Sequence, residues 1–312
     1  MNKVTTVKQP TTAIATVGIS PDLFDSFFNF IDAKPASIEG YKRALRQFFR
    51  YLAINNINQP TREDILNFRE ELKVDHKATT VQLYIVAVRL FFKWTEQTGL
   101  YKNIADNIKG AKISREHKKD YLTTKQVKAV LAGIDRNTLT GKRDYAIFAL
   151  MLTGGLRTIE VSRANIEDVR TLGDGTVLYI QGKGREEKTD YVKLVAQVEE
   201  AIRDYLKAVG LVDVKSPLFA STSNNSKGLR LTTRTISGII KEHLKQVGFN
   251  SDRLTAHSLR HTAGTLNLMN GGTLEETQQL LRHSNINTTM IYLHHIQRES
   301  NHSEQRIASA LF

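Results

Sequence analysis

The chain has 312 residues, of which 40% are hydrophobic, so it is long enough for about two globular domains with real cores and is not a disordered polypeptide. It contains no cysteine, which excludes disulfides, thiolate catalysis and cysteine metal sites. Lys and Arg exceed Asp and Glu by 44 to 32, and the resulting net charge of +12 favours a polyanionic partner.

We expect neither a membrane span nor a leader peptide in this chain. Its longest apolar run, Tyr145 to Leu152, is far shorter than the ~20 residues that cross a bilayer. Lys3 and Lys8 precede no continuous apolar segment, so we expect no signal peptide, no membrane partner and a cytoplasmic, nucleoid-associated protein. Residues 1–20 lack an apolar period and are predicted to form a flexible tail.

Residues 21–108 are predicted to form an all-helical domain. Its segments of helical apolar spacing begin at Pro21, after Ser37, at Thr61, and at Thr79 or Thr80. Thr61 and Asp64 have the spacing of a capping box. The Phe and Leu stripes predict a bundle core rather than surfaces that stack on bases. The second segment also has a basic face, a candidate for contact with a DNA groove, formed by Lys42, Arg43, Arg46 and Arg50.

Residues 109–121 are predicted to be a basic interdomain linker, because the apolar period fails there while lysines accumulate. The linker is expected to be solvated or to lie against DNA phosphates, and both can hold at once. Residues 122–312 then predict a second domain, mainly α with a small antiparallel sheet. Its expected elements are a helix capped by Thr123 and Gln126, a central apolar helix over Asp144–Leu152, a strand hairpin, and later helices. The hairpin strands are Thr176–Gln181 and Thr189–Leu194, and the later helices include Val198–Val209 and Thr233–Val247.

The residues best suited to chemistry lie between Thr255 and His295. His257 and Arg260 are three apart and would share a helix face, and His283 and Tyr292 follow them. A tyrosine hydroxyl has a pKa of about 10, so it attacks a phosphodiester only if the phosphate is made more electrophilic. Preorganised cations on the non-bridging oxygens do this, and arginine suits the role because its fork binds two oxygens.

Two further residues complete a site that needs neither metal nor cofactor. Arg157 follows the Gly154-Gly155 break at a predicted helix start, where the helix dipole also favours an anion. Lys183 lies at the hairpin tip and could protonate the leaving oxygen. A zinc site is disfavoured, because no Glu follows His257 as in an H-E-x-x-H motif.

The chain resembles the tyrosine recombinase family, which comprises phage integrases and Xer-type recombinases. The matching segments are G-G-L-R-T-I-E-V at 154–161, G-K-G at 182–184, H-S-L-R-H-T at 257–262 and L-L-R-H-S-N-I-N-T-T-M-I-Y at 280–292. They occur in the family's order and at about its spacing. The resemblance covers nearly all of residues 21–312 and implies a helical, SAM-like core-binding domain followed by a catalytic domain, which together form a C-shaped clamp on DNA.

The resemblance also implies roles for individual residues. The scissile phosphate would be activated by Arg157, Lys183, His257, Arg260 and His283, and Tyr292 would form a 3′-phosphotyrosyl link. Glu160 would support Arg157, and His261 would pack beside the site. The chain departs from the family at Arg282, where a glycine is common, and Arg282 would be either an extra phosphate contact or an exposed side chain. Lys183 shares its hairpin with Arg185 and Lys188, which remain alternatives to it.

The implied function is site-specific recombination through a Holliday junction, for integration or excision of a mobile element or for resolution of replicon dimers. The implied partners are double-stranded DNA with an inverted-repeat core site and a homo-tetramer, or a hetero-tetramer with a paralogue, on two such sites. Alternatives are a type IB topoisomerase and a catalytically silent DNA-binding relative. The apolar residues Ile307, Leu311 and Phe312 would dock on a neighbouring protomer or fold back on their own domain. With about 20 residues before the bundle, we expect no separate arm-binding domain.

Overall fold

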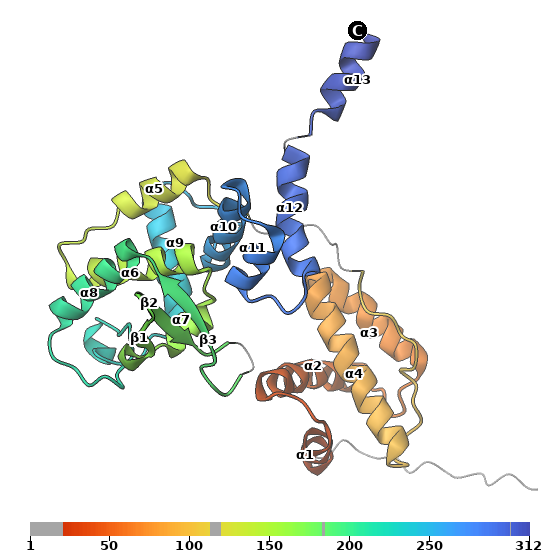
Figure 1. Cartoon of the computed structure of the whole chain (residues 1–312). Helices are drawn as coiled ribbons and strands as arrows, with labels where there is room; N and C mark the ends of the chain where they lie inside the picture. Colours follow the sequence, from red (N-terminus) through yellow and green to blue (C-terminus); the bar gives the residue numbers. More distant parts are fainter. Residues whose placement is uncertain (1–20, 113–119, 183–184, 300) are drawn as a thin grey trace, which may run out of the picture. The chain divides into compact units, whose positions relative to one another are not determined.

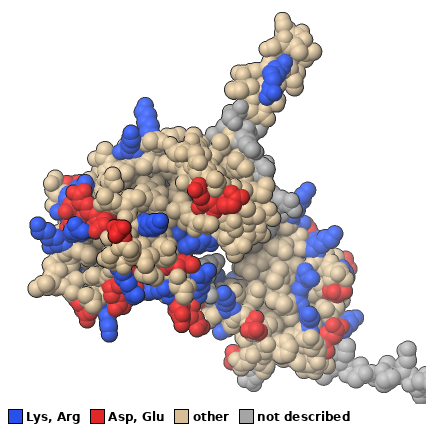
Figure 2. Space-filling model, viewed as in Figure 1, with Lys and Arg blue, Asp and Glu red and all other residues tan. Residues whose placement is uncertain are grey.

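The computed structural model describes residues 21–112, 120–182, 185–299 and 301–312. The chain divides into two compact units, Met1–Arg115 and Glu116–Phe312. The predicted tail over residues 1–20 and most of the predicted linker over residues 109–121 lie outside the described residues. Among the helices that the structure describes, none combines the length and the apolarity that a membrane span requires. On the face shown in Figure 2, Lys and Arg side chains occur on both units, mixed with Asp and Glu.

The first unit is a helical bundle (Figure 1). Its helices are α1 (Pro21–Phe30), α2 (Pro35–Ile54), α3 (Arg62–Asp75) and α4 (Ala78–Gln97). The core contains Phe27, Phe48, Phe68 and Val88, each no more than 1% exposed, which confirms that the aromatic stripes form a core. The capping box at the start of α3 is confirmed, because the Thr61 backbone N–H donates to the Asp64 carboxylate over 2.7 Å.

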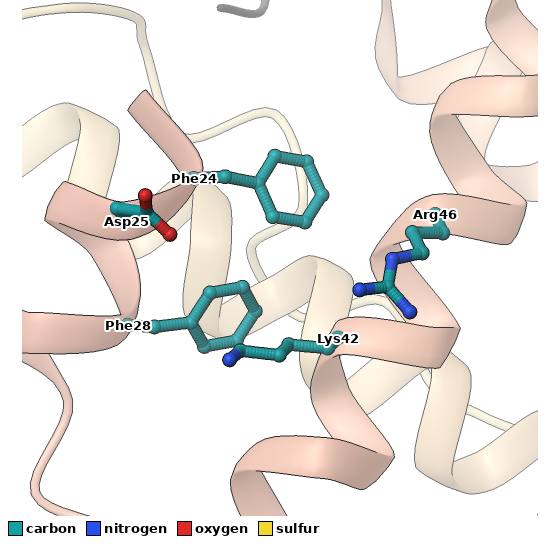
Figure 3. Close-up of a pocket in the computed structure, with 5 residues that line it drawn as sticks. All are labelled: Phe24, Asp25, Phe28, Lys42 and Arg46. Carbon is teal, nitrogen blue, oxygen red and sulfur yellow. The ribbon is translucent and has the colours of Figure 1, made fainter. Parts of the chain in front are cut away.

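The second helix begins earlier than the sequence predicts. We expected it to start after Ser37, but α2 begins at Pro35. Proline is tolerated in the first turn of a helix, because the N–H that it lacks would have no intrahelical partner there. In Figure 3, α1 and α2 border a hollow lined by Phe24, Asp25, Phe28, Lys42 and Arg46. The Lys42 ammonium lies 5.5 Å from the centroid of the Phe28 ring, so part of the predicted basic face of α2 borders this hollow.

The second unit combines helices with a three-stranded antiparallel sheet of order β1-β2-β3 (Figure 1). Its strands are β1 (Val169–Leu172), β2 (Gly175–Ile180) and β3 (Asp190–Leu194). Its α-helices are α5 (Thr124–Ala132), α6 (Leu139–Gly154), α7 (Thr158–Arg163), α8 (Ala196–Val209), α9 (Thr233–Gln246), α10 (Ala256–Met269), α11 (Leu274–Leu281), α12 (Asn287–Glu299) and α13 (Ser303–Leu311), with short 3₁₀ turns at Ile166–Asp168 and Asn224–Ser226.

The central position of α6 is confirmed, because Ile147 and Phe148 are fully buried in the main core of the unit. The hairpin is confirmed as β2 and β3, with Leu178 opposite Val192. The sequence analysis missed β1, which pairs with β2 from the other side. Its segment V-R-T-L is short, and only its first residue is partly buried, so it lacks the alternation that identifies a strand.

Candidate active site

The turn between α6 and α7 positions Arg157. Gly155 caps α6 in the left-handed conformation, with φ of 58°, and a Cβ there would lie 2.6 Å from Leu281 Cδ2. The chain then extends, and α7 begins after Arg157. Glu160 is fully buried and accepts hydrogen bonds from the Arg157 backbone N–H and from its guanidinium Nη1, both over 2.8 Å. The expected support of Arg157 by Glu160 is therefore present, and the Arg157 side chain remains 29% exposed.

Helix α10 carries the second arginine. Arg260 is 1% exposed, and its guanidinium donates to the backbone carbonyls of Gly155 and Leu281. These contacts tie α10 to the end of α6 and to the end of α11. His257 lies one turn earlier and is exposed, with its ring centroid 4.6 Å from that of His261. The prediction that His257 and Arg260 lie on one helix is therefore confirmed, but His257 is exposed to solvent and Arg260 is buried.

His283 and Tyr292 come together after α11. His283 Nδ1 lies 2.9 Å from Thr289 Oγ1, so the first turn of α12 orients the imidazole. Tyr292 is 5% exposed and packs in a small cluster with Ala263 and Leu281. The ring of His261 meets the Tyr292 ring edge-on at a centroid distance of 5.1 Å. Tyr292 is therefore buried between neighbouring helices in this structure.

Gly264 permits this packing of the tyrosine against α10. A Cβ at Gly264 would lie 2.9 Å from Leu281 Cδ1 and 3.3 Å from Tyr292 Cε2. Since nine in ten real Cβ contacts are longer than these distances, a side chain at this position would displace its neighbours. The requirement is tertiary, because nothing in the local sequence shows that the helix face at Gly264 meets the tyrosine.

The electrostatics of the site favour an incoming anion. Burial, and then the charges of Arg260, Arg157 and Arg282, lower the pKa of His283 to about 4, so His283 is neutral near pH 7. Burial and the charge of Arg157 also lower the pKa of Arg260. Burial raises the pKa of Tyr292, and the charges of Arg260 and Arg157 oppose that rise. The positive charges of these side chains thus repel one another, whereas a phosphate bound among them would attract each of them.

One of the two expectations for Arg282, an exposed side chain, is wrong. Its side chain is 11% exposed, and its Nη2 lies 3.0 Å from the Glu160 carboxylate. Its guanidinium also donates to backbone carbonyls of Leu280, Gly154 and Gly155. Arg282 is therefore neither an exposed side chain nor free to bind phosphate through its terminal nitrogens. The only sequence signal for this role was the departure at Arg282 from the glycine that the resemblance implies.

Lys183 lies outside the described residues, so its predicted place at the hairpin tip stays a prediction. The two alternatives on the same hairpin have acidic partners. Arg185 pairs with Asp190 over 2.7 Å, and Lys188 pairs with the buried carboxylate of Asp168 over 2.5 Å. The described part of the chain brings no three potential metal ligands of the His, Asp or Glu type together.

The chain matches two family models, "Phage integrase family" over residues 120–299 and "Phage integrase, N-terminal SAM-like domain" over residues 25–99. A tyrosine recombinase XerC from Thermodesulfovibrio yellowstonii is 28% identical over 270 residues, which cover 83% of this chain and 85% of that protein. A tyrosine recombinase XerC from Chlamydia trachomatis is 30% identical over 236 residues, which cover 75% of this chain and 73% of that protein. The crystal structure of the XerH site-specific recombinase bound to palindromic difH substrate has the same fold, with a TM-score of 0.70, 22% identity, and coverage of 90% of this chain and 80% of that chain.

Proposed function

We propose, since this chain belongs to the phage integrase family of tyrosine recombinases, that it recombines DNA at specific sites through a 3′-phosphotyrosyl bond to Tyr292. The observation that carries this assignment is the convergence of Arg157, Arg260, His283 and Tyr292 from four separate segments. These groups carry more positive charge than Glu160 neutralises. A phosphodiester bound among them would relieve that imbalance, as transition-state stabilisation by fixed cations requires.

In the proposed reaction, the Tyr292 hydroxyl loses its proton to solvent as its oxygen attacks phosphorus, and the bond from phosphorus to the 5′-oxygen breaks. Arg157 and Arg260 bind the non-bridging oxygens, where charge accumulates in the transition state. His283 and His257 contribute hydrogen bonds to the same phosphate. Lys183 gives its proton to the leaving 5′-oxygen. The new bond retains the free energy of the phosphodiester, so a second 5′-hydroxyl can displace the tyrosine without ATP.

The described state precedes this reaction, because Tyr292 is 5% exposed. Among the described members of the set, Arg157 and the exposed His257 are the side chains most accessible to an arriving phosphate. We propose that DNA contacts them first and that the first turns of α12 then move as a unit to present the tyrosine. The packing of Tyr292 would thus keep the nucleophile from reacting before DNA is bound.

The proposed assembly is four protomers on two core sites with inverted repeats, with strand exchange through a Holliday junction and with the two domains of each protomer clamping one half-site. A paralogue could supply two of the four protomers. Helix α13 supports an intermolecular role, because it contains no buried residue and exposes Ile307, Leu311 and Phe312 by 59%, 70% and 105%. Such a segment fits an apolar pocket on a neighbouring protomer. The biological task is the integration or excision of a mobile element, or the resolution of replicon dimers.

A suicide duplex tests the chemistry. The duplex carries the inverted-repeat core site and a nick next to the scissile phosphate, so that the cleaved fragment diffuses away and the covalent complex accumulates. We expect a protein–DNA adduct with the wild type and none with Tyr292→Phe, which removes only the attacking oxygen. Absence of an adduct with cognate DNA would overturn catalysis and favour a silent DNA-binding protein.

A second duplex separates recombination from a topoisomerase reaction. We expect the wild type to transfer a labelled strand from one duplex to another that carries the same core site. Religation that always restores the original strand would instead indicate nicking and closing alone.

A further inference from the structure

Arg282 adopts a backbone conformation that most side chains avoid. It ends α11 in the left-handed region, with φ of 52° and ψ of 47°. For a residue with a Cβ this conformation is less favourable than the right-handed one. Glycine would accept the same turn without that cost. The contacts of the arginine side chain must therefore account for its presence here.

Those contacts hold three segments of the site together. One terminal nitrogen of Arg282 lies 3.0 Å from Glu160 Oε2, and the other donates to Leu280 O over 2.7 Å and to Gly154 O over 3.2 Å. The guanidinium thus joins the end of α6, the start of α7 and the turn before His283. Burial raises the pKa of Glu160, but the charge of Arg282 and then the hydrogen bonds from Arg157 outweigh burial and lower it.

Arg282 also shares an acceptor with each of the other two arginines. The Glu160 carboxylate receives Arg157 at Oε1 and Arg282 at Oε2. The Gly155 carbonyl receives hydrogen bonds from Arg260 Nη1 and from Arg282 Nη2. Three guanidinium groups are therefore organised around one carboxylate and one carbonyl.

We infer that Arg282 is a positioning residue for DNA cleavage, which holds the Glu160 carboxylate so that Arg157 can direct its remaining N–H groups at the phosphate. Together, Arg157, Glu160 and Arg282 carry a net charge of +1. Without Arg282, the carboxylate and Arg157 would form a neutral pair, and Arg157 could bind phosphate only by leaving a buried carboxylate beside it. This inference rests on the proposed function.

The test uses the full chain and the suicide duplex, with single-turnover cleavage measured at saturating DNA. Arg282→Gly suits the backbone conformation and removes the guanidinium. We expect cleavage to slow by on the order of tenfold or more, while DNA affinity changes little, because both terminal nitrogens of Arg282 already bond to Glu160 and backbone carbonyls. Arg136→Ala is the matched control, since Arg136 pairs with Asp204 on the surface of the same unit, and its cleavage rate should equal that of the wild type.

A double-mutant cycle distinguishes positioning from general damage to the fold. If Arg282 acts through Glu160, adding Arg282→Gly to Glu160→Gln should slow cleavage far less than Arg282→Gly slows it in the wild type. Fully multiplicative effects, or a wild-type rate in Arg282→Gly, would overturn the inference. Failure of the wild type to form any adduct would instead overturn the proposed function.

If the glycine variant does not fold, Arg282→Lys provides the alternative test. The lysine keeps the charge and the apolar stem but loses the fork that reaches Glu160 and the two glycine carbonyls together. We expect slowed cleavage with unchanged DNA affinity in this variant also. A wild-type cleavage rate in Arg282→Lys would overturn the inference.

Discussion

The ring of Tyr292 lies parallel to the imidazole of His283, with 6° between the ring planes and 6.3 Å between the centroids. The two residues lie on either side of the start of α12, and Thr289 between them bonds to the imidazole. The orientation of His283 and the position of the tyrosine are thus set by the same two turns of helix. Any change that moves the start of α12 should affect both groups at once.

Gly264→Ala should disturb the packing of Tyr292. The added methyl would lie within 3.3 Å of the Tyr292 ring, so we expect a loss of about 1–3 kcal/mol in the free energy of unfolding, measured by urea denaturation. Gly238→Ala on α9 is the control, because a Cβ there meets nothing within 4 Å. That control should stabilise the protein by up to ~1 kcal/mol. Equal effects of the two substitutions would contradict the packing described for Tyr292.

The pH dependence of stability should contain a contribution from His283. Its pKa is lowered from 6.5 to about 4 in the folded chain, so between these values the unfolded state binds more protons. Stability should therefore fall as the pH decreases from about 6.5 towards about 4. His283→Gln, which cannot titrate, should reduce this dependence in urea unfolding measured across that range. An unchanged dependence would show that His283 is not the group that resists protonation.

Arg157→Ala and Arg260→Ala should both lower the single-turnover cleavage rate by about 10²-fold or more, because each removes a fixed cation from the transition state. Site binding, measured by mobility shift, should remain within a few-fold of the wild type. Only Arg260→Ala should also lower stability markedly, since it removes the guanidinium that donates to the Leu281 carbonyl and one of the two guanidinium donors to the Gly155 carbonyl. If DNA binding falls as much as the cleavage rate does, these arginines bind phosphate but do not act in the chemical step.

Lys183→Ala and Lys188→Ala should fail in different ways. If Lys183 protonates the leaving oxygen, its alanine variant should cleave slowly on a normal phosphodiester and recover on a substrate with a 5′-bridging sulfur, because a thiolate leaves without a proton. Lys188→Ala should instead lower the free energy of unfolding by about 3 kcal/mol, because the carboxylate of Asp168, which is 1% exposed, loses its cationic partner. Rescue of Lys188→Ala by sulfur would assign the acid to Lys188.

Removal of residues 303–312 should leave the unfolding free energy within about 0.5 kcal/mol of the full chain, because α13 contains no buried residue. We expect the truncated chain to bind a single half-site normally but to assemble poorly on a full core site and to lose strand transfer. Native gels with one and two half-sites measure this. Normal assembly together with a large loss of stability would show that the segment folds back on its own domain.

Much of this protein could be predicted from local patterns. The capping boxes at Thr61 and Thr123 and the buried α6 depend on neighbouring residues, and the structure confirms them. The motifs also supplied Arg157, Arg260, His283 and Tyr292 as a candidate set. Strand β1 was missed because its edge position comes from pairing with β2 and not from its own four residues.

The sequence by itself determined which residues could carry the chemistry and that helices would carry most of them. The tertiary structure decided that Arg282 lies against Glu160, 122 residues earlier in the chain, and that Gly264 makes room for Tyr292. Neither relationship has a local signature. Both follow from α6, α10 and α11 converging on the Gly154-Gly155 turn, where a buried charge needs partners from distant segments and a close contact excludes a side chain.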